Sequence, residues 1–349
     1  MSALWGQLTP GLEQINVQLN QAKDSLNRPD FERLKRNDPF DRQIRQLRRT
    51  TEAQSGAQKV TRAWLKFYEI LELTPAGQYL LGLQDPIRAF FNAELPGAFV
   101  LAANHYFSTH NKTLQWVVSS YLPKGADDHL EDQYGLIEQN PDRSLVGVIS
   151  TNKGNFYSDG DLTNPKVPSV LAHLARLRLG DSPVLYTADG GFDVTGRENE
   201  QETVSTRLIA GEIETGFLSL KNGGVMVLKI FTFFTGEMLA YVLTLMRAFE
   251  QTNIFKPSTS GPTNSESYFI GIDYKGGARL PVGPEEITAT LISATDEELL
   301  FIWNRASPLF TRQIEAIRQF ISGTLQPVIN LKAESVPKLP SERRIALNS

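Results

Sequence analysis

The sequence contains no cysteine in its 349 residues. Without a thiol, the protein cannot form disulfides, bind zinc through thiolates or use a cysteine nucleophile. The four histidines are His105, His110, His129 and His173. Their spacing matches no common zinc motif, so we expect no metal site. These absences fit a reducing compartment and leave the chemistry to other side chains.

Long apolar runs are also absent. No stretch of about 18 uncharged apolar residues occurs, so we expect no membrane span. The first residues lack the basic and then apolar pattern of a signal peptide. The net charge of −4 at pH 7 gives no overall attraction to nucleic acid. Any RNA binding must therefore come from a local basic patch.

Three parts are expected along the chain. Residues 1–58 form a helical basic extension, in which Leu12, Ile15 and Leu19 share one helix face. Residues 59–277 form the main domain. Residues 278–349 form a helical appendage that begins a helix at a capping box of Thr295 and Glu298 and ends in about 15 loose residues.

The basic part of the extension has two interpretations. From residue 32 to residue 62 there are nine Lys or Arg and four acidic residues. The stretch is either a solvated helix face or a surface that tracks phosphates toward Lys66.

The main domain alternates helical and strand patterns. Helices are expected at 61–73, 168–179, 204–220 and 236–249, and strands at 145–150, 184–187, 225–231 and 268–273. This alternation predicts an α/β fold with a doubly wound sheet flanked by helices. The polar and mixed segment 104–144 is predicted to be an insertion outside the sheet.

Four charged residues fall where such a sheet binds its ligands. Asp189 follows the strand 184–187, and Lys229 lies near the end of the apolar strand 225–231. Glu266 precedes the strand 268–273, and Lys66 lies on the first helix. Ligands of open α/β sheets bind at the carboxyl ends of strands. Buried ammonium and carboxylate groups are costly unless paired, which favours chemistry over separate surface ion pairs.

The same segments carry a resemblance to a known family. Residues 62–70, Asp189, the strand from Gly223 through Lys229 to Phe231, and the stretch 256–268 resemble the FtsJ/RrmJ-like family of S-adenosylmethionine-dependent RNA ribose 2′-O-methyltransferases. The resemblance implies a Rossmann-like methyltransferase fold and S-adenosylmethionine as cofactor. It also implies a catalytic set of Lys66, Asp189, Lys229 and Glu266, with Lys229 as general base, and RNA contacts from Arg62, Lys256 and Ser260.

The cofactor loop is a variant of the family pattern. Residues 93–99 are similar to the glycine-rich turn that approaches the cofactor, with Ala98 in place of a glycine. The cofactor residues that the resemblance implies are Glu94, Pro96, Gly97, Ala98, Phe99, Asp161 and Asp189. The acid that should hold the cofactor ribose is missing from the stretch 148–152, where we look for it.

The variant loop and the segment 104–144 are similar to the cap methyltransferases of large DNA viruses. The resemblance therefore implies capped mRNA as substrate, methylated at its first transcribed nucleotides. The aromatic candidates for stacking on the cap are Trp116, Tyr121, Phe156 and Tyr157. We expect RNA as partner, with no DNA and no membrane, and protein partners through the helical extensions.

Two alternatives stay open at this point, ribosomal RNA as the substrate and a catalytically inactive scaffold that keeps the methyltransferase fold. We expect a cytoplasmic location, including a viral factory or a virion, and the nucleus stays open.

Overall fold

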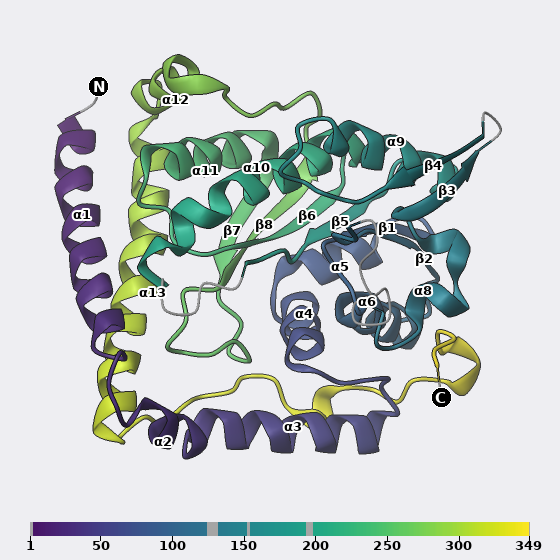
Figure 1. Cartoon of the computed structure of the whole chain (residues 1–349), viewed down its shortest axis with the longest axis horizontal. Helices are drawn as coiled ribbons and strands as arrows, with labels where there is room; N and C mark the ends of the chain where they lie inside the picture. Colours follow the sequence, from purple (N-terminus) through teal and green to yellow (C-terminus); the bar gives the residue numbers. More distant parts are fainter. Residues whose placement is uncertain (1–2, 124–131, 152–153, 193–197, 349) are drawn as a thin grey trace.

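The computed structural model describes residues 3–123, 132–151, 154–192 and 198–348 (Figure 1). The elements of the first half are α1 (Ala3–Asp24), α2 (Phe31–Arg36), α3 (Pro39–Ser55), α4 (Arg62–Leu73), α5 (Pro75–Leu81), β1 (Ile87–Asn92), α6 (Ala98–Thr109), β2 (Leu114–Val118), α8 (Leu136–Gln139), β3 (Gly147–Thr151) and β4 (Gly154–Ser158). Those of the second half are α9 (Val167–Leu179), β5 (Leu185–Ala188), α10 (Gln201–Ser219), β6 (Val225–Ile230), α11 (Gly236–Ala248), β7 (Phe249–Phe255), β8 (Ser267–Tyr274), α12 (Gly283–Ile292) and α13 (Asp296–Ser322).

A six-stranded sheet forms the centre of the molecule, in the order β2-β1-β5-β6-β8-β7. The first four strands of this order run parallel, whereas β8 is antiparallel to both β6 and β7. Helices α9, α10 and α11 lie on one face and α4, α5 and α6 on the other (Figure 1). The predicted α/β fold with a doubly wound sheet is therefore confirmed.

Each face of the sheet buries its own core. Along β6, Met226 and Leu228 belong to the core shared with α9, α10 and α11. Val225 and Val227 belong to the core shared with α4 and α6. Successive side chains of a strand point to opposite faces, so a strand covered on both sides is apolar throughout. The sequence of β6 is therefore a nearly continuous apolar run because both faces of this strand are buried.

The segment 104–144 corrects one prediction. Residues Leu114–Val118 form β2, which pairs with β1 at the edge of the central sheet. The helix α6 is the crossover that connects these two parallel strands. The prediction that this whole segment lies outside the sheet is therefore wrong. The predicted strand at 145–150 exists as β3, but it pairs with β4 in a separate two-stranded sheet.

The helices of the two terminal parts pack on the outside of the domain. Leu12, Ile15 and Leu19 of α1 are buried, as predicted, and α1 packs along α13. Thr295 and Glu298 form the predicted capping box at the start of α13. In Figure 1, α3 runs along the lower edge, beneath α4.

The last residues are not loose, contrary to the prediction. Leu339 donates its backbone N–H to the Ser55 carbonyl at 2.8 Å, and Ile345 donates to the Gln58 side chain at 3.0 Å. The tail therefore straps the end of α3 to the domain, and the C-terminal part is helical only through α12 and α13 and two short 3₁₀ turns. Among the described residues, no helix has the length and apolar character needed to cross a membrane.

Candidate active site

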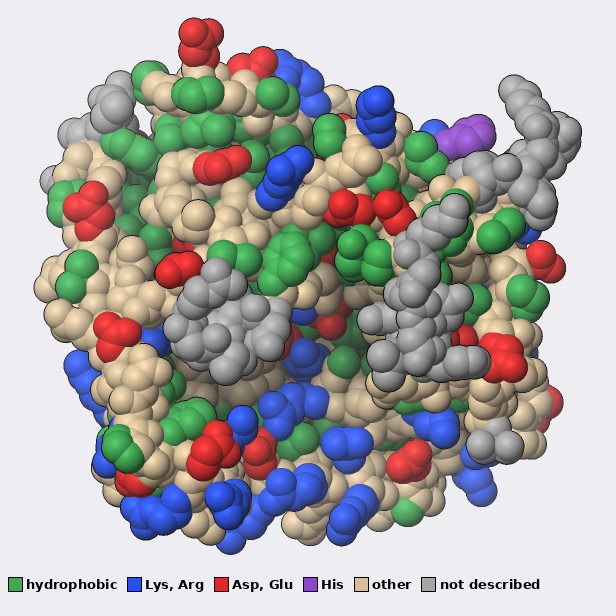
Figure 2. Space-filling view, viewed as in Figure 1, with side chains coloured by type: hydrophobic (Ala, Val, Ile, Leu, Met, Phe, Trp, Pro, Cys, Tyr) green, Lys and Arg blue, Asp and Glu red, His purple; other side chains and the backbone are tan. Residues whose placement is uncertain are grey.

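The four predicted charged side chains meet at the carboxyl ends of β5 and β6. The Oδ1 atom of Asp189, which follows β5, lies 3.3 Å from Nζ of Lys229 on β6. That amine also donates to the backbone carbonyl of Asp189 at 2.6 Å. Nζ of Lys66 on α4 lies 2.5 Å from Oε1 of Glu266. Figure 2 shows a hollow near the middle of this face, where Lys or Arg and acidic side chains lie together.

The alternation of β6 explains why Lys229 reaches this cluster. Lys229 lies two residues after Val227, whose side chain packs on the α4 side of the sheet. Its side chain therefore points toward the helix that carries Lys66. On the neighbouring strand β8, Tyr268 pairs directly with Lys229.

The Tyr268 hydroxyl links the two ion pairs. It lies 2.8 Å from Oδ1 of Asp189 and 2.7 Å from Oε1 of Glu266, and the residue is fully buried. Burial and the two carboxylates raise the pKa of Tyr268 well above its usual value. The hydroxyl therefore stays protonated and can donate to one carboxylate at a time. The prediction missed this residue, although its position two residues after Glu266 places both on one side of the chain.

The charges of the cluster set the protonation of Lys229. Burial lowers the pKa of this amine, but Asp189, Glu266 and Glu212 outweigh burial and raise it above the usual value. Lys229 is therefore an ammonium ion in the protein alone. Burial opposes ionisation of Glu266 too, but Lys66 and Lys229 hold its pKa below the usual range.

The loop 256–266 is held against α4 at one end and closed on itself at the other. Glu69, one helical turn after Lys66, accepts hydrogen bonds from the backbone N–H groups of Ser258 and Thr259 at 2.8 and 2.9 Å. At the other end, Nζ of Lys256 donates to the Glu266 carbonyl at 2.8 Å and to both oxygens of Asn264. The helix that presents Lys66 therefore also fixes the loop that presents Glu266.

The contacts of Lys256, Ser260 and Arg62 bear on the prediction that these three residues bind RNA. Nζ of Lys256 makes its three hydrogen bonds inside the loop, and burial lowers the pKa of this amine to about 7. Ser260 is 2% exposed and its hydroxyl bonds to Asn264, which makes it part of the loop and not of an RNA-facing surface. Arg62 is exposed and forms an ion pair with Asp41 at 2.5 Å.

Two further carboxyl groups are buried behind the cluster. Glu94 accepts a hydrogen bond from the N–H of Phe99 at the start of α6, and burial raises its pKa well above the usual value. Glu212 of α10 accepts from the N–H of Gly190 at 2.9 Å. Burial raises the pKa of Glu212 to about 8, and Lys229 and the bond from Gly190 oppose this rise. Nothing in the sequence separates Glu212 from the other acids of its helix.

The Glu212 carboxyl should make the stability depend on pH. The folded state keeps its proton up to about pH 8, whereas the unfolded chain loses it near 4.5. This group therefore favours folding below about pH 4.5, and its contribution is lost as the pH rises to about 8. We expect Glu212→Gln to gain about 2–5 kcal/mol relative to wild type between pH 5 and pH 8.5. Urea unfolding at both pH values measures this gain, and Glu214→Gln, exposed on the same helix, is the control. An equal pH dependence in both variants would contradict the assignment.

A cavity of about 570 Å³ opens beside Asp189. This volume lies within the range of small-molecule sites, about 300–1,000 Å³. The cavity is bounded by the ends of β1, β2 and β5 and by the turn that carries Asp161. Its lining residues are Asn92, Ala93, Leu95, Ser120, Tyr121, Gly160, Asp161, Leu162, Thr163, Asp189, Gly190, Gly191, Phe192 and Leu208.

The predicted cofactor residues divide into two groups. Asp161 and Asp189 line the cavity, whereas residues 94 and 96–99 form the turn behind it. Gly97 has φ of +110° in this turn, and a Cβ there would lie 2.4 Å from Leu136. Glycine is needed for this close approach. Ala93 and Leu95 supply the surface that the loop offers to the cavity.

The strand that follows the cofactor loop is β2, so the acidic residue expected to bind the cofactor ribose should lie after β2. Residues 148–151 belong to β3 of the separate two-stranded sheet, and residue 152 lies outside the described residues, so the prediction named the wrong strand. After β2 the chain continues with Ser119, Ser120 and Tyr121, and the last two line the cavity. No acid follows this strand directly either. The turn of Asp161 packs onto the same segment, since the Leu122 N–H donates to the Asp159 carbonyl at 2.7 Å.

The four aromatic candidates are not equivalent. Trp116 is 5% exposed inside β2, so it offers no stacking face and this prediction is wrong. Tyr121 is 56% exposed at the cavity and Tyr157 is 37% exposed. The side chain of Phe156 lies outside the described residues.

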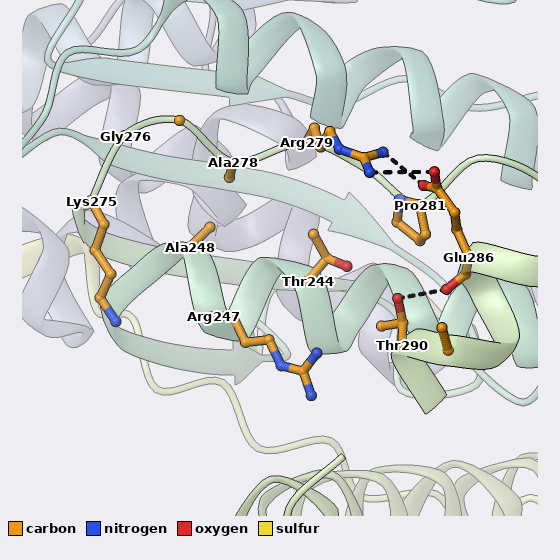
Figure 3. Close-up of a pocket in the computed structure, with 12 residues that line it drawn as sticks. Thr244, Arg247, Ala248, Lys275, Gly276, Ala278, Arg279, Pro281, Glu286 and Thr290 are labelled. Carbon is orange, nitrogen blue, oxygen red and sulfur yellow. Dashed lines mark hydrogen bonds and ion pairs between the residues drawn. The ribbon is translucent and has the colours of Figure 1, made fainter. Parts of the chain in front are cut away.

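A second cavity, of about 600 Å³, lies elsewhere, between α11, α12 and the turn after β8. It contains three cationic side chains (Figure 3). Arg247 is paired with Glu298, Arg279 with Glu286 at 2.7 Å, and Lys275 with Glu250 at 3.6 Å. These charges are already neutralised and none of the four active-site residues lines the cavity, so the chemistry belongs to the cavity beside Asp189.

Comparisons with known proteins find similarity to methyltransferases. Residues 126–274 match the model of the FtsJ-like methyltransferase family. The chain is 41% identical over 228 residues to a probable methyltransferase, EP424R, of African swine fever virus (strain Badajoz 1971 Vero-adapted), which covers 64% of this chain and 52% of that protein. It is 30% identical over 269 residues to the cap-specific mRNA (nucleoside-2'-O-)-methyltransferase 2 of Mus musculus, covering 76% of this chain and 34% of that protein.

The chain thus spans about half the length of the viral relative and a third of the mouse one. A solved structure described as a ribosomal RNA methyltransferase from Plasmodium falciparum has a TM-score of 0.41 and 12% identity, over 60% of this chain and 97% of that one.

Proposed function

We propose that this chain, which contains a segment of the FtsJ-like methyltransferase family, transfers a methyl group from S-adenosylmethionine to the ribose 2′-hydroxyl of RNA. The observation that carries the proposal is the pair of lysine–carboxylate contacts joined by Tyr268, next to a cavity of suitable size. We further propose capped mRNA as the substrate and the cytoplasm as the location. The mouse relative is named for cap-specific mRNA methylation, which favours this RNA over ribosomal RNA.

The cavity beside Asp189 fits the cofactor by its polar lining as well as its volume. One oxygen of Asp161 is used by the N–H and hydroxyl of Thr163, at 2.9 and 2.7 Å. Its second oxygen has no partner within the described part of the chain and can accept from a ligand hydroxyl or amine. At the other end, the Gly190 and Gly191 backbone leads to Asp189 and Lys229, so a ligand lying along the cavity ends at the charged cluster.

The charged cluster would position the ribose and take its proton. Bound S-adenosylmethionine supplies the methyl group, which it carries on a cationic sulfonium. Positive charge close to Lys229 lowers the pKa of this amine and favours the neutral form. Nζ of Lys229 would then accept the ribose O2′–H proton, and the bound cofactor would supply the methyl group to that oxygen. Alignment of the reacting atoms supplies a large part of the rate.

The other residues keep this geometry. Asp189 holds the Lys229 amine through its carbonyl and its carboxylate. Lys66 and Tyr268 hold the Glu266 carboxylate, which faces the same space. Because each carboxylate is paired, the cluster can stay ionised away from bulk water.

A methyl-transfer assay with S-adenosylmethionine and short RNAs tests the function. The RNAs should be identical except for a 5′ cap. We expect transfer to the 2′-hydroxyl of the first transcribed nucleotides of the capped RNA. Transfer to the uncapped RNA that equals or exceeds transfer to the capped one would contradict a cap-specific substrate. The absence of transfer to both, with cofactor binding intact, would favour an inactive scaffold.

Asp161→Asn should weaken cofactor binding. We expect about a tenfold to hundredfold increase in Kd for S-adenosylmethionine, because an amide presents one acceptor where the carboxylate presents two and cannot counter a positive charge. Isothermal titration calorimetry measures this change. Asp142→Asn is the control, since the Asp142 side chain is 93% exposed and does not line the cavity. Equal Kd values for wild type and Asp161→Asn would contradict the proposal that the cofactor binds in this cavity.

A further inference from the structure

Helix α3 carries a row of exposed arginines along one face. Arg42, Arg45 and Arg49 are spaced by three and four residues, which puts them on one side of a helix. All three are exposed, and none has a carboxylate partner in the described part of the chain. The opposite face of α3 buries Phe40 and Ile44 against the domain. The row is therefore fixed in place by packing that the arginines do not take part in.

The row lies close to the active site along the chain and in space. Asp41, next to Arg42, forms an ion pair with Arg62 at the first position of α4, and Lys66 lies one helical turn later. Arg48, between the arginines of the row, donates to the Val60 carbonyl at 2.8 Å. Figure 2 shows Lys and Arg side chains gathered along the edge where Figure 1 places α2 and α3, on the same face as the hollow.

This charge needs an explanation because the protein as a whole is negative, at −4. Helix α3 contains four arginines but only two acids, Asp41 and Glu52, and the first of these is already paired. Like charges repel and are expected to be spread apart unless a ligand compensates for them. A polyanion that follows the row would do so.

We propose that Arg42, Arg45 and Arg49 bind the phosphate backbone of the substrate RNA beyond the nucleotide in the active site. The proposal rests on the function proposed above. Arg49 lies seven residues after Arg42, which is about 10 Å along a helix. At roughly 3.4 Å per nucleotide of a stacked strand, this length serves about three phosphates. Guanidinium groups suit this task because they bind phosphate with two parallel hydrogen bonds.

The test compares two triple variants of the full chain. Arg42→Gln/Arg45→Gln/Arg49→Gln removes the row, and Arg305→Gln/Arg312→Gln/Arg318→Gln removes the same charge from exposed positions of α13. Glutamine keeps the helix propensity of arginine. Fluorescence anisotropy with a labelled RNA of about 15 nucleotides gives Kd over a series of salt concentrations, which reports the number of phosphate contacts.

We expect the α3 variant to bind about 10–100-fold more weakly at 0.1 M salt and its slope of log K against log salt to fall by about 2. The α13 variant should bind like wild type. An unchanged slope in the α3 variant, or an equal loss in both variants, would overturn the proposal.

Two further measurements separate this proposal from the proposed function. RNA binding is measured without methyl transfer. A protein that binds RNA through α3 but transfers no methyl group would therefore refute the proposed function and still support the proposed role of the three arginines. With an RNA of about two nucleotides, which leaves at most about one phosphate beyond the nucleotide in the active site, the α3 variant should methylate at the wild-type rate. A lower rate of methyl transfer by the α3 variant with this short RNA would show that the substitutions disturb the active site, and it would overturn the proposal.

Discussion

Lys229→Met is expected to lower the rate of methyl transfer about 10³-fold, within the range that a general base supplies. Methionine fills a similar volume in the strand β6 but cannot accept a proton. The loss should appear in single-turnover rates measured at saturating RNA and cofactor. Binding of S-adenosylmethionine should not weaken, because Lys229 does not line the cavity beside Asp189 and its removal relieves repulsion with the positive charge of the cofactor.

Lys229→Arg is the control that separates proton transfer from charge alone. Arginine keeps the positive charge between Asp189 and Glu266, but it does not lose its proton in proteins. If Lys229 is the base, both variants are inactive. Activity close to wild type in Lys229→Arg would show that the site needs a cation and that another group takes the proton.

The pH dependence of the wild-type protein checks the same assignment. The carboxylates around Lys229 raise its pKa in the free protein, so the neutral amine becomes tenfold more abundant with each pH unit. kcat/KM reports the free protein and should rise with a slope near one through pH 9. A value of kcat/KM that stays flat from pH 7 to pH 9 would contradict a base with this pKa.

The strands that carry Asp189 and Lys229 could be predicted because they are buried on both faces. A central parallel strand is a continuous apolar run, and a lysine inside such a run stands out. Two edge strands escaped prediction for the opposite reason, and the central strand β1 escaped it too, although five of its six residues are buried. β2 begins with Leu114 and Gln115, which are only partly buried, and β7 mixes exposed Glu250 and Gln251 with apolar ends. A strand with one solvated side has a pattern that a polar loop can share.

The supporting residues of the site depend on contacts between distant parts of the chain. Glu69 reaches a loop 189 residues further on, and Glu212 binds the backbone 22 residues earlier. Neither position differs in sequence from a surface glutamate on an amphipathic helix. The charged residues of the cluster could be proposed from their local patterns, whereas the residues that hold them in place need the three-dimensional structure.

Lys66 and Glu266 should behave as one unit in a double-mutant cycle. We expect Lys66→Met and Glu266→Gln each to lower the rate of methyl transfer about 10²–10³-fold, and the double variant to be little worse than either. The reason is that each single change leaves the other group without its ion-pair partner in a site where both side chains are at most 14% exposed. Breaking a buried pair from one side can cost about 3–5 kcal/mol.

The same cycle has a stability readout. Lys66→Met removes the charge that contributes most to lowering the pKa of Glu266, so this carboxyl should then bind a proton more readily. Urea unfolding should show each single variant to be less stable than wild type, and the double variant should recover part of the loss. Rate effects that multiply in the double variant would mean that Lys66 and Glu266 act separately. The ion pair would then contribute to the fold of the site but not to the alignment of the ribose.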